Sequence, residues 1–381
     1  MSKVSNGYGG EKQQLNDGRD SRGETAKLGT DRFVNNPILT PADVKPFRED
    51  FEVIGTFNAG VAMYDGETIL LSRVAERPKV TDATIVRIPF YDHEAARLAI
   101  HNFDTRQSEF DFSDPRGISS KSGKHTAYLT SLSYLRIARS RDGIHFTVDE
   151  KAFMFPENEY EAFGLEDPRI TQIGDEYYIT YTSVSSLGVG VGLAMTTDFK
   201  RVQRLGLIFP PENKDVVIFP EVIEGKYYAL HRPSVSGLGN PEIWVASSTD
   251  LVHWGGHRHL MGIRPDSWDS VRLGAGAVPI KTEDGWLEIY HGSDEEGRYT
   301  LGAVLLDLKD PTKIIARSDR PILEPEADYE VNGFYKNVVF SCGLIAEGDR
   351  LRIYYGVADT AMAGVELDLQ DVMDSLNLQR V

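Results

Sequence analysis

The amino-acid sequence predicts an all-β protein, a five-bladed β-propeller with an irregular N-terminal tail and a C-terminal helix. The main observation is a phrase that occurs five times: a short apolar run, a glycine-containing turn and a second run rich in aromatic residues. This pattern is typical of a β-hairpin. Because the hairpins recur along the chain, they predict a repeat of β-blades. The copies are FNAGVAMYDGETILLSRV (57–74), LEDPRITQIGDEYYITYT (165–182), FPEVIEGKYYALHR (219–232), GAGAVPIKTEDGWLEIYHG (274–292) and FSCGLIAEGDRLRIYYG (340–356).

A second repeated pattern predicts the outer strands of the blades. Each copy is an apolar strand followed by Ser, Thr or Leu, any residue, and Asp. The Asp side chain accepts hydrogen bonds from the backbone two residues on, so it begins a turn. The copies are 136–146, 193–202, 244–254 and 303–314.

Three regions follow from these repeats. Residues 1–30 are polar and glycine-rich and predict a loosely ordered tail that packs on the body or on a neighbouring copy in a homo-oligomer. Residues 31–364 form the predicted propeller, with a loop at its rim over 103–120. Residues 365–381 have apolar residues near helical spacing and predict the C-terminal helix.

Composition excludes several classes of partner. The net charge of −17, with no long basic stretch, argues against nucleic acid and anionic membrane surfaces. No apolar run reaches the ~18 residues of a membrane span. The single cysteine, Cys342, indicates a reducing compartment, and the N-terminus has no apolar signal-peptide core. We therefore expect a cytoplasmic protein.

The openings of the repeats carry unlike residues, which suggests one site assembled from several blades. In GLEDPRI (164–170), Asp167 precedes a proline and is therefore extended, and Arg169 shares its face if the strand has begun. A structural Asp–Arg pair that closes a blade is the alternative. The same DPR tripeptide at 114–116 does not lie at a repeat opening.

Basic residues stand at matching points of the later repeats: Lys214, His231, Arg232 and Arg272. Converging Lys and Arg side chains would hold a phosphate or sulfate strongly, since Arg binds such oxyanions with paired hydrogen bonds. The alternative is a set of separate surface ion pairs with carboxylates such as Asp215 and Asp269.

Other polar and aromatic residues at strand ends are candidates for binding a sugar. Asp359 in YYGVAD could accept bonds from sugar hydroxyls, His291 in IYHG is similar, and Tyr181 is one of several tyrosines and tryptophans at strand ends. Most such aromatic residues fill the core of a propeller. The sequence has no phosphate-binding glycine loop before a helix, no Cys/His metal set and no serine nucleophile elbow, so no metal site is predicted.

Taken in order, six motifs resemble glycoside hydrolase family 130, whose members are five-bladed β-propeller enzymes that act on β-mannosides, mostly as phosphorylases. The resemblance covers about residues 35–362. The motifs are GLEDPRIT (164–171), NKDVVIFPE (213–221), LHRP (230–233), RLGAGAVPI (272–280), IYHG (289–292) and YYGVAD (354–359).

The resemblance implies inverting phosphorolysis, in which phosphate attacks the anomeric carbon and yields α-mannose 1-phosphate. It implies that Asp167 is the proton donor, acting through the mannose 3-hydroxyl rather than in the usual two-carboxylate scheme. It assigns phosphate binding to Lys214, His231, Arg232 and Arg272, and mannose binding to Asn58, Arg73 and Asp359. It requires no cofactor, because inorganic phosphate is a co-substrate.

Two alternatives remain open. Some family members are β-mannosidases that use carboxylates to activate water, and Glu221 and Glu242 lie near the same motifs. A non-catalytic sugar-binding propeller is the other alternative, although a lectin requires neither Asp167 nor the basic residues. The stretch from Asp114 through 131–143 is more similar to members acting on β-1,2-mannosides.

Overall fold

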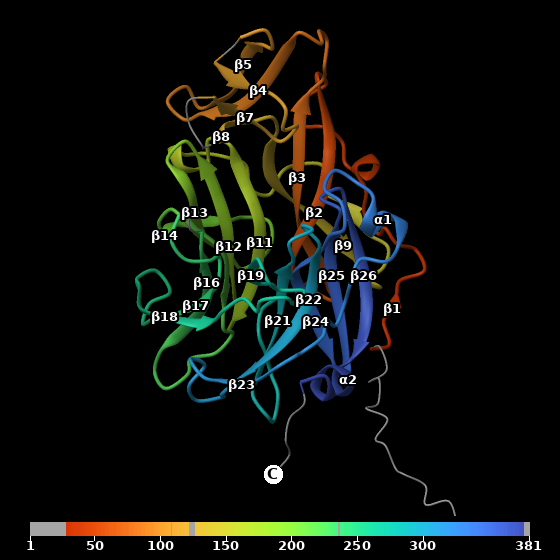
Figure 1. Cartoon of the computed structure of the whole chain (residues 1–381), viewed down its shortest axis with the longest axis vertical. Helices are drawn as coiled ribbons and strands as arrows, with labels where there is room; N and C mark the ends of the chain where they lie inside the picture. Colours follow the sequence, from red (N-terminus) through yellow and green to blue (C-terminus); the bar gives the residue numbers. More distant parts are fainter. Residues whose placement is uncertain (1–27, 108, 122–125, 235–236, 377–381) are drawn as a thin grey trace, which may run out of the picture.

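Strands make up most of this chain, which confirms the predicted all-β class (Figure 1). The structure is a computed structural model and describes residues 28–107, 109–121, 126–234 and 237–376. Within these ranges the α-helices are two short ones, α1 (Asp328–Val331) and α2 (Leu369–Asp374), and there are two 3-10 turns, η1 (Pro41–Asp43) and η2 (Glu159–Glu161). Of the predicted N-terminal tail, residues 1–27 lie outside the described residues. No described helix has the length and apolar character needed to cross a membrane.

The first two predicted hairpins lie in one eight-stranded sheet. Neighbouring strands are antiparallel except β9 and β11, which are joined by a parallel bridge between Ser133 and Gly164. Gly164 has a φ of +122°, and a Cβ there would overlap the backbone of Ser133, so the close approach requires glycine. The strands are β2 (Phe51–Tyr64), β3 (Glu67–Pro78), β9 (Leu132–Ser140), β10 (Thr147–Val148), β11 (Gly164–Ile173), β12 (Glu176–Ser185), β13 (Gly188–Thr196) and β14 (Gln203–Phe209).

Three further antiparallel sheets correspond to the other three predicted hairpins. The prediction of the third hairpin over 219–232 was wrong in part, because its first strand lies before Phe219. The third sheet contains β15 (Asn213–Ile218), β16 (Tyr227–Pro233), β17 (Ile243–Ser248) and β18 (Trp254–Met261). The fourth contains β19 (Arg272–Ala275), β20 (Ile280–Lys281), β21 (Trp286–Ser293), β22 (Tyr299–Leu306) and β23 (Ile314–Arg317). The last contains β24 (Val339–Glu347), β25 (Arg350–Val357), β26 (Ala361–Asp368) and the N-terminal β1 (Asp31–Arg32), which pairs with β26.

Residues 79–131 form an inserted module at the top of Figure 1. The predicted loop over 103–120 was therefore wrong in part, because this range holds strands of two small sheets. Phe103, Phe110 and Ile118 pack together with Tyr128, and this satellite core stabilises strands too short to be recognised in the sequence. The strands are β4 (Ile85–Asp92), β5 (Arg97–Asp104), β6 (Phe110–Asp111), β7 (Gly117–Ser120) and β8 (Thr126–Leu129).

The C-terminal helix begins later than the sequence pattern predicted. Residues 365–368 end β26, since Val365 and Leu367 are buried against β25 while Glu366 alternates with them. The helix α2 starts after Asp368, whose side chain accepts hydrogen bonds from the first backbone N–H groups. The prediction over 365–368 was wrong because four residues fit both periods. Residues 377–381 lie outside the described residues.

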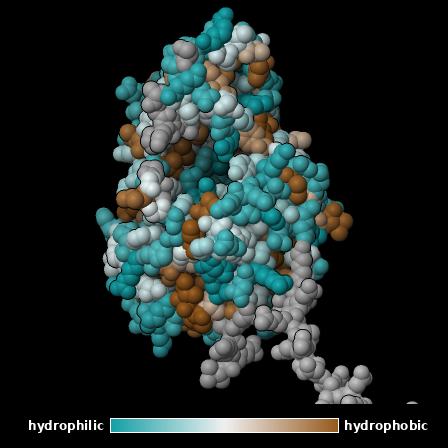
Figure 2. Space-filling model, in the orientation of Figure 1, coloured by the Kyte–Doolittle hydropathy of each residue, from teal (hydrophilic) through white to brown (hydrophobic). Residues whose placement is uncertain are grey.

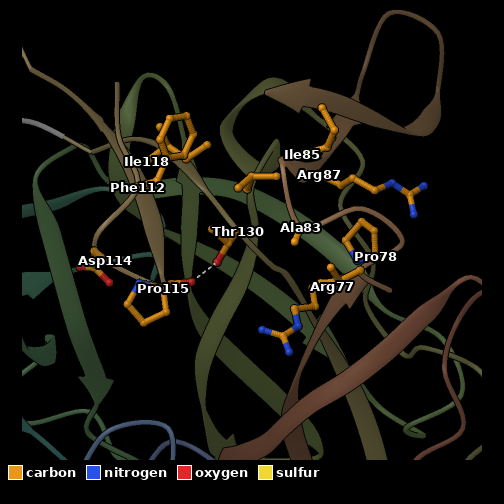
Figure 3. A pocket seen from close by; sticks show the side chains of 12 residues that line it. Arg77, Pro78, Ala83, Ile85, Arg87, Phe112, Asp114, Pro115, Ile118 and Thr130 are labelled. Carbon is orange, nitrogen blue, oxygen red and sulfur yellow. Dashed lines mark hydrogen bonds between the residues drawn. The ribbon is translucent and has the colours of Figure 1, made fainter. Parts of the chain in front are cut away.

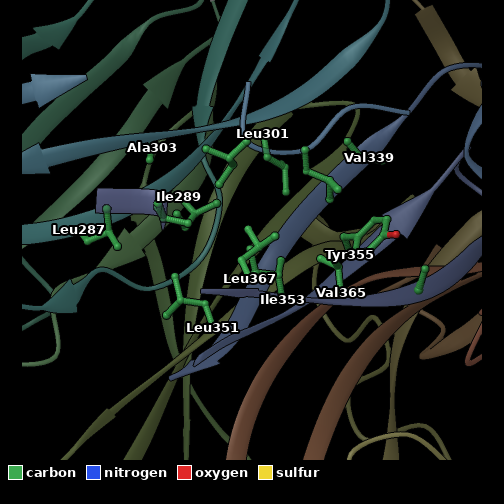
Figure 4. Packing of buried hydrophobic residues seen from close by; sticks show 14 of the residues in the cluster. Leu287, Ile289, Leu301, Ala303, Val339, Leu351, Ile353, Tyr355, Val365 and Leu367 are labelled. Carbon is green, nitrogen blue, oxygen red and sulfur yellow. The ribbon is translucent and has the colours of Figure 1, made fainter. Parts of the chain in front are cut away.

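Apolar packing between neighbouring sheets fixes the strands that carry the site. Figure 4 shows Leu287, Ile289 and Leu301 of the fourth sheet against Ile353 and Val365 of the last. All five side chains are almost completely buried. Each such side chain contributes roughly 1.5–3 kcal/mol through burial. The strand ends are therefore held in a well-packed frame.

Candidate active site

The same irregularity occurs in the first strand of three hairpins. The register shifts at corresponding points of β2, β11 and β15, and the displaced residues are Asn58, Asp167 and Asp215. Their φ angles are +51°, +47° and +53°, a left-handed region that Asn and Asp tolerate better than other side chains. The prediction that Asp167 is extended was therefore wrong, because the bulge overrides the preference set by the following proline. Such a bulge re-aims a side chain. The sequence therefore uses residue types suited to this backbone at three equivalent positions.

The Asp167 carboxylate lies where three strands meet. Its Oδ1 accepts a hydrogen bond from Asn58 Nδ2 at 2.9 Å and another from Arg73 Nη1 at 3.2 Å. The other terminal nitrogen of Arg73 donates to Glu166 Oε1 at 2.8 Å. Asp167 is buried, with 7% of its surface exposed. The structure thus brings together the predicted proton donor and two predicted mannose-binding residues, Asn58 and Arg73.

The charges around Asp167 keep it ionised at neutral pH. Burial on its own would raise the pKa, but the cations of Arg73, Arg169 and Lys214 outweigh it, and the pKa lies below its usual value. A proton carried by this group must therefore arrive with the reactants, or when an anion neutralises the surrounding cations.

Asp359 lies near the same arginine but is shifted in the opposite direction. Burial, with smaller contributions from Asp167 and Glu166, raises the pKa of Asp359 to about 6, while Arg73 opposes the shift. Asp359 follows β25 with a φ of +50° and lines the same cavity as Arg73. Three acidic groups therefore lie near one guanidinium, and Asp359 gains a proton more easily than Asp167.

This shift predicts how stability changes with pH. Between pH ~4 and ~6 the folded protein holds a proton on Asp359 that the unfolded chain has released, so the free energy of unfolding falls as pH rises. We expect the Asp359→Asn variant to gain stability relative to wild type over this window, by up to about 3 kcal/mol at ~1.4 kcal/mol per pKa unit. Urea unfolding of both proteins at pH 4.5 and pH 7 measures this difference. An equal difference at the two pH values would contradict the shift.

A second group of side chains surrounds Asp215. Its carboxylate lies 3.1 Å from Arg169 Nη2 and 3.2 Å from Arg232 Nη2. His291 Nε2 lies 3.4 Å from it. The cations lower the pKa of Asp215 well below its usual value although burial opposes them. The carboxylate is therefore a fixed charge that joins β11, β16 and β21.

Two arginines near this group have unused donors. The Nε atoms of Arg232 and Arg272 are buried and have no hydrogen-bond partner within the described residues. The Arg272 guanidinium lies 5.9 Å from the centre of the Tyr299 ring. Lys214 has its Nζ 3.9 Å from Glu166 Oε2 and lines the large cavity. Buried donors without partners are costly, so they indicate a ligand that accepts hydrogen bonds.

Three predicted site residues are placed differently from the expectation. Tyr181 lies in the core and donates its hydroxyl to Glu161 at 2.8 Å, so the structure does not bring it to Asp167. His231 faces Asn213, His257 and the Phe209 ring, and burial lowers its pKa to about 3, so it carries no charge at neutral pH. His291 has no exposed surface for a sugar and instead stands between Asp215 and the Phe340 ring.

In the sequence, Asp215 was interpreted only as an ion-pair partner, because the third hairpin was expected to begin at Phe219. Its first strand is instead β15 (Asn213–Ile218). With this strand in place, Asp215 in NKDVV stands where Asp167 stands in LEDPR and Asn58 in FNAGV. Arg169 was predicted to share the face of Asp167, yet its guanidinium reaches Asp215 and the backbone carbonyls of Ala275 and Asp167.

A large cavity lies between the inserted module and the sheets; Arg73, Glu166 and Lys214 line it, whereas Asp167, Arg232 and Arg272 are not among its lining residues. Its volume is about 1010 Å³. Figure 2 shows the surface hollowed just below the inserted module, with hydrophilic residues in the hollow. Its lining includes Arg73, Glu166, Lys214 and Asp359 from the sheets, and Asp114, Arg116 and Tyr128 from the module.

A smaller cavity of about 240 Å³ lies between the inserted module and the end of β3. Figure 3 shows Phe112, Ile118 and Ile85 around it, and the Thr130 hydroxyl donating to the Pro115 carbonyl at 2.6 Å. None of the charged residues around Asp167 or Asp215 lines this cavity. The chemistry is therefore assigned to the larger one. Among the described residues no group of three or more His, Cys, Asp and Glu could hold a metal ion.

Comparison with known proteins identifies the family. A family model for glycoside hydrolase family 130, described as beta-1,4-mannooligosaccharide phosphorylase, matches residues 124–378. The chain belongs to glycoside hydrolase family 130. The resemblance seen in the motifs is thereby confirmed.

Individual members of family 130 are similar over most of the chain. A beta-1,2-mannobiose phosphorylase of Listeria innocua is 56% identical over 349 residues, covering 91% of this chain and 98% of the relative. A 1,2-beta-oligomannan phosphorylase of a Thermoanaerobacter species is 44% identical over 253 residues, covering 66% of this chain and 83% of the relative. The solved Listeria innocua enzyme in complex with beta-1,2-mannobiose superposes with a TM-score of 0.90, at 55% identity, covering 92% of this chain and all of that one.

Proposed function

We propose that this protein catalyses the inverting phosphorolysis of a β-mannoside, releasing α-mannose 1-phosphate and a shortened sugar without a cofactor. The observation that carries the proposal is that a buried carboxylate, Asp167, is connected to an arginine with an unpartnered donor: Arg169 contacts the Asp167 carbonyl and the Asp215 carboxylate, and Asp215 pairs with Arg232. Arg272 has a second unpartnered donor. The carboxyl group can donate a proton toward the leaving sugar, and the cations can bind the phosphate. The named activities of the family 130 relatives support this reaction and favour β-1,2-linked mannosides as substrates.

The five hairpin units form, in this proposal, the five blades of a closed propeller. The blades are β2–β3–β9–β10, β11–β14, β15–β18, β19–β23 and β24–β26 with β1. Support comes from contacts between the units: β2 packs against both β11 and β24, β15 packs against β11 and β19, and β21 packs against β24. Together these contacts join each unit to the next one and join the last unit to the first, as a closed ring of blades requires.

In the proposed reaction, hydrogen phosphate held by Lys214, Arg232 and Arg272 attacks the anomeric carbon from the face opposite the leaving sugar. A bond forms between a phosphate oxygen and this carbon, and the bond to the glycosidic oxygen breaks. Asp167, which is ionised in the free enzyme, takes up a proton once bound phosphate has neutralised the surrounding cations. It gives this proton to the leaving oxygen through the mannose 3-hydroxyl, and the acidic proton of hydrogen phosphate restores it, so the sum consumes no proton.

The positions of two other carboxylates favour phosphorolysis over hydrolysis. A β-mannosidase would need a carboxylate to activate water, and the sequence offered Glu221 and Glu242. Glu221 pairs with Lys281 and Glu242 with His259, and these ion pairs include none of the residues around Asp167. A phosphate dianion needs no activating base, and a carboxylate beside it would repel it.

The test is to incubate the enzyme with β-1,2-mannobiose with and without inorganic phosphate. We expect mannose 1-phosphate and mannose only when phosphate is present, and faster turnover of β-1,2- than of β-1,4-mannobiose. Free mannose as the sole product in both reactions would identify a hydrolase. Saturable binding of mannobiose with no product under either condition would identify a sugar-binding protein.

We further propose that the enzyme works in the cytoplasm. Inorganic phosphate is available there as co-substrate, and a charged sugar phosphate is retained by the cell membrane. The single buried cysteine, Cys342, is compatible with a reducing compartment.

A further inference from the structure

We infer that Asp215 is a positioning residue that holds the Arg232 guanidinium in the orientation needed to bind phosphate. The inference rests on the proposed function, because it concerns the phosphate half of that site. Neither Asp215 nor Arg232 lines the large cavity, although Lys214, the residue before Asp215, does. An effect of Asp215 on phosphate must therefore pass through the residues that it contacts.

The first support is the geometry around the carboxylate. Asp215 is 2% exposed and receives a cation on each oxygen, with Arg169 Nη2 3.1 Å from Oδ1 and Arg232 Nη2 3.2 Å from Oδ2. The contact between Arg232 and Asp215 is an ion pair rather than a hydrogen bond, because Asp215 Oδ2 has no hydrogen-bond partner among the described residues, and Arg232 Nε is likewise unpartnered. The ion pair holds the guanidinium and leaves an N–H donor for an oxyanion.

The second support is the rigidity of the surrounding packing. Arg169 is anchored by the carbonyl oxygens of Asp167 and Ala275, so it cannot follow the carboxylate if the latter moves. On the other side, a Cβ on Gly274 would overlap both the Asp215 carboxylate and the His291 ring. The left-handed backbone at Asp215 itself fixes where the side chain begins. The carboxylate therefore has one position available.

Two effects of removing the charge oppose each other. The loss of a negative charge near bound phosphate would strengthen anion binding, whereas the release of Arg232 would weaken it. Asp215 already faces two guanidinium groups, so the pairs around it carry a net positive charge and its repulsion of phosphate is largely compensated. We therefore expect the loss of orientation to outweigh the loss of repulsion.

The principal test is the Asp215→Asn variant, which keeps the size of the side chain and removes its charge. We expect the KM for phosphate to rise about 10- to 100-fold, the range seen for partners that orient metal ligands, while the KM for mannobiose changes little. A purely structural role would lower the melting temperature without separating the two KM values.

The matched control is Asp269→Asn, a second buried aspartate held by two arginines, Arg264 and Arg317. It lies in the connection between β18 and β19, and its partners differ from those of Asp215. We expect a lower melting temperature in this variant and unchanged KM values for both substrates. The contrast separates the effect of breaking a buried ion pair from the effect on phosphate.

A second pair of variants moves the carboxylate without changing its charge. Gly274→Ala pushes on Asp215 and His291, whereas Gly292→Ala, on the opposite face of the sheet, pushes on Asp269 and Trp268. We expect only Gly274→Ala to raise the KM for phosphate. This pair decides the question if Asp215→Asn does not fold.

The outcomes distinguish a failure of the proposed function from a failure of the proposed role of Asp215. Wild-type turnover without any need for phosphate would overturn the proposed function. Phosphate-dependent wild-type turnover, together with an unchanged or lower phosphate KM in Asp215→Asn and in Gly274→Ala, would overturn the role of Asp215 and leave the proposed function standing.

Discussion

Replacing Asp167 with Asn should lower the turnover of β-mannobiose by about 10²- to 10⁴-fold, the usual contribution of a positioned proton donor. Asn keeps the shape of the side chain and tolerates the left-handed backbone at this position. Arg73 retains its bond to Glu166, so it is not left as an unpaired buried charge. The change therefore removes the proton and leaves the surroundings in place. Turnover measured at saturating phosphate and mannobiose gives the effect.

The control for this variant is again Asp269→Asn, which makes the same chemical change at a buried, arginine-paired aspartate away from the cavity. Circular dichroism and melting temperatures of both variants establish that they fold. Near-normal turnover of a folded Asp167→Asn protein would show that another group supplies the proton.

Replacing Lys214 or Arg272 with Ala should mainly raise the KM for phosphate. A hydrogen bond to a charged group contributes about 1.5–3 kcal/mol, which corresponds to a loss of roughly 10-fold or more in phosphate affinity. The expectation rests on the unpartnered Nε of Arg272 and on the position of Lys214 in the cavity lining. Initial rates at varied phosphate and saturating mannobiose measure the change.

A suitable control is Lys281→Ala, which removes an exposed cation paired with Glu221 outside the cavity. We expect this variant to keep the wild-type KM for phosphate. If Lys214→Ala and Arg272→Ala also keep it, phosphate binds elsewhere and the proposed anion site is wrong.

Much of the fold could be predicted because the residue patterns that identify strands and turns lie close together in the sequence. Each predicted hairpin combines two strands and a turn within fewer than twenty residues, and four of the five are found where they were predicted. In the third, the second strand was predicted correctly, but the first strand, β15, ends at Ile218, before the predicted run. The inserted module could not be predicted in the same way. Its strands β6, β7 and β8 are short, and they are stabilised by contacts among Phe103, Ile118 and Tyr128, which are well separated in the sequence.

The site was predicted less completely, because sequence order does not say which face a side chain takes. His231 and Arg232 are neighbours in β16, so they point to opposite faces of the sheet. Arg232 reaches Asp215, while His231 packs on Phe209. The family resemblance assigned phosphate binding to both residues, but only Arg232 contacts Asp215.

The left-handed backbone at Asn58, Asp167 and Asp215 limits how this enzyme can be redesigned. A longer acid such as Glu at position 167 would change the reach of the carboxyl group, and it would also carry a backbone penalty of order 1–3 kcal/mol at a position that disfavours it. Asn or Gly at position 167 removes the carboxyl group without that penalty. Mutant libraries aimed at new acceptor sugars should therefore keep a short side chain at these three positions. They should vary the rim of the cavity instead, where residues such as Arg116 and Phe334 line the cavity and do not have a left-handed backbone.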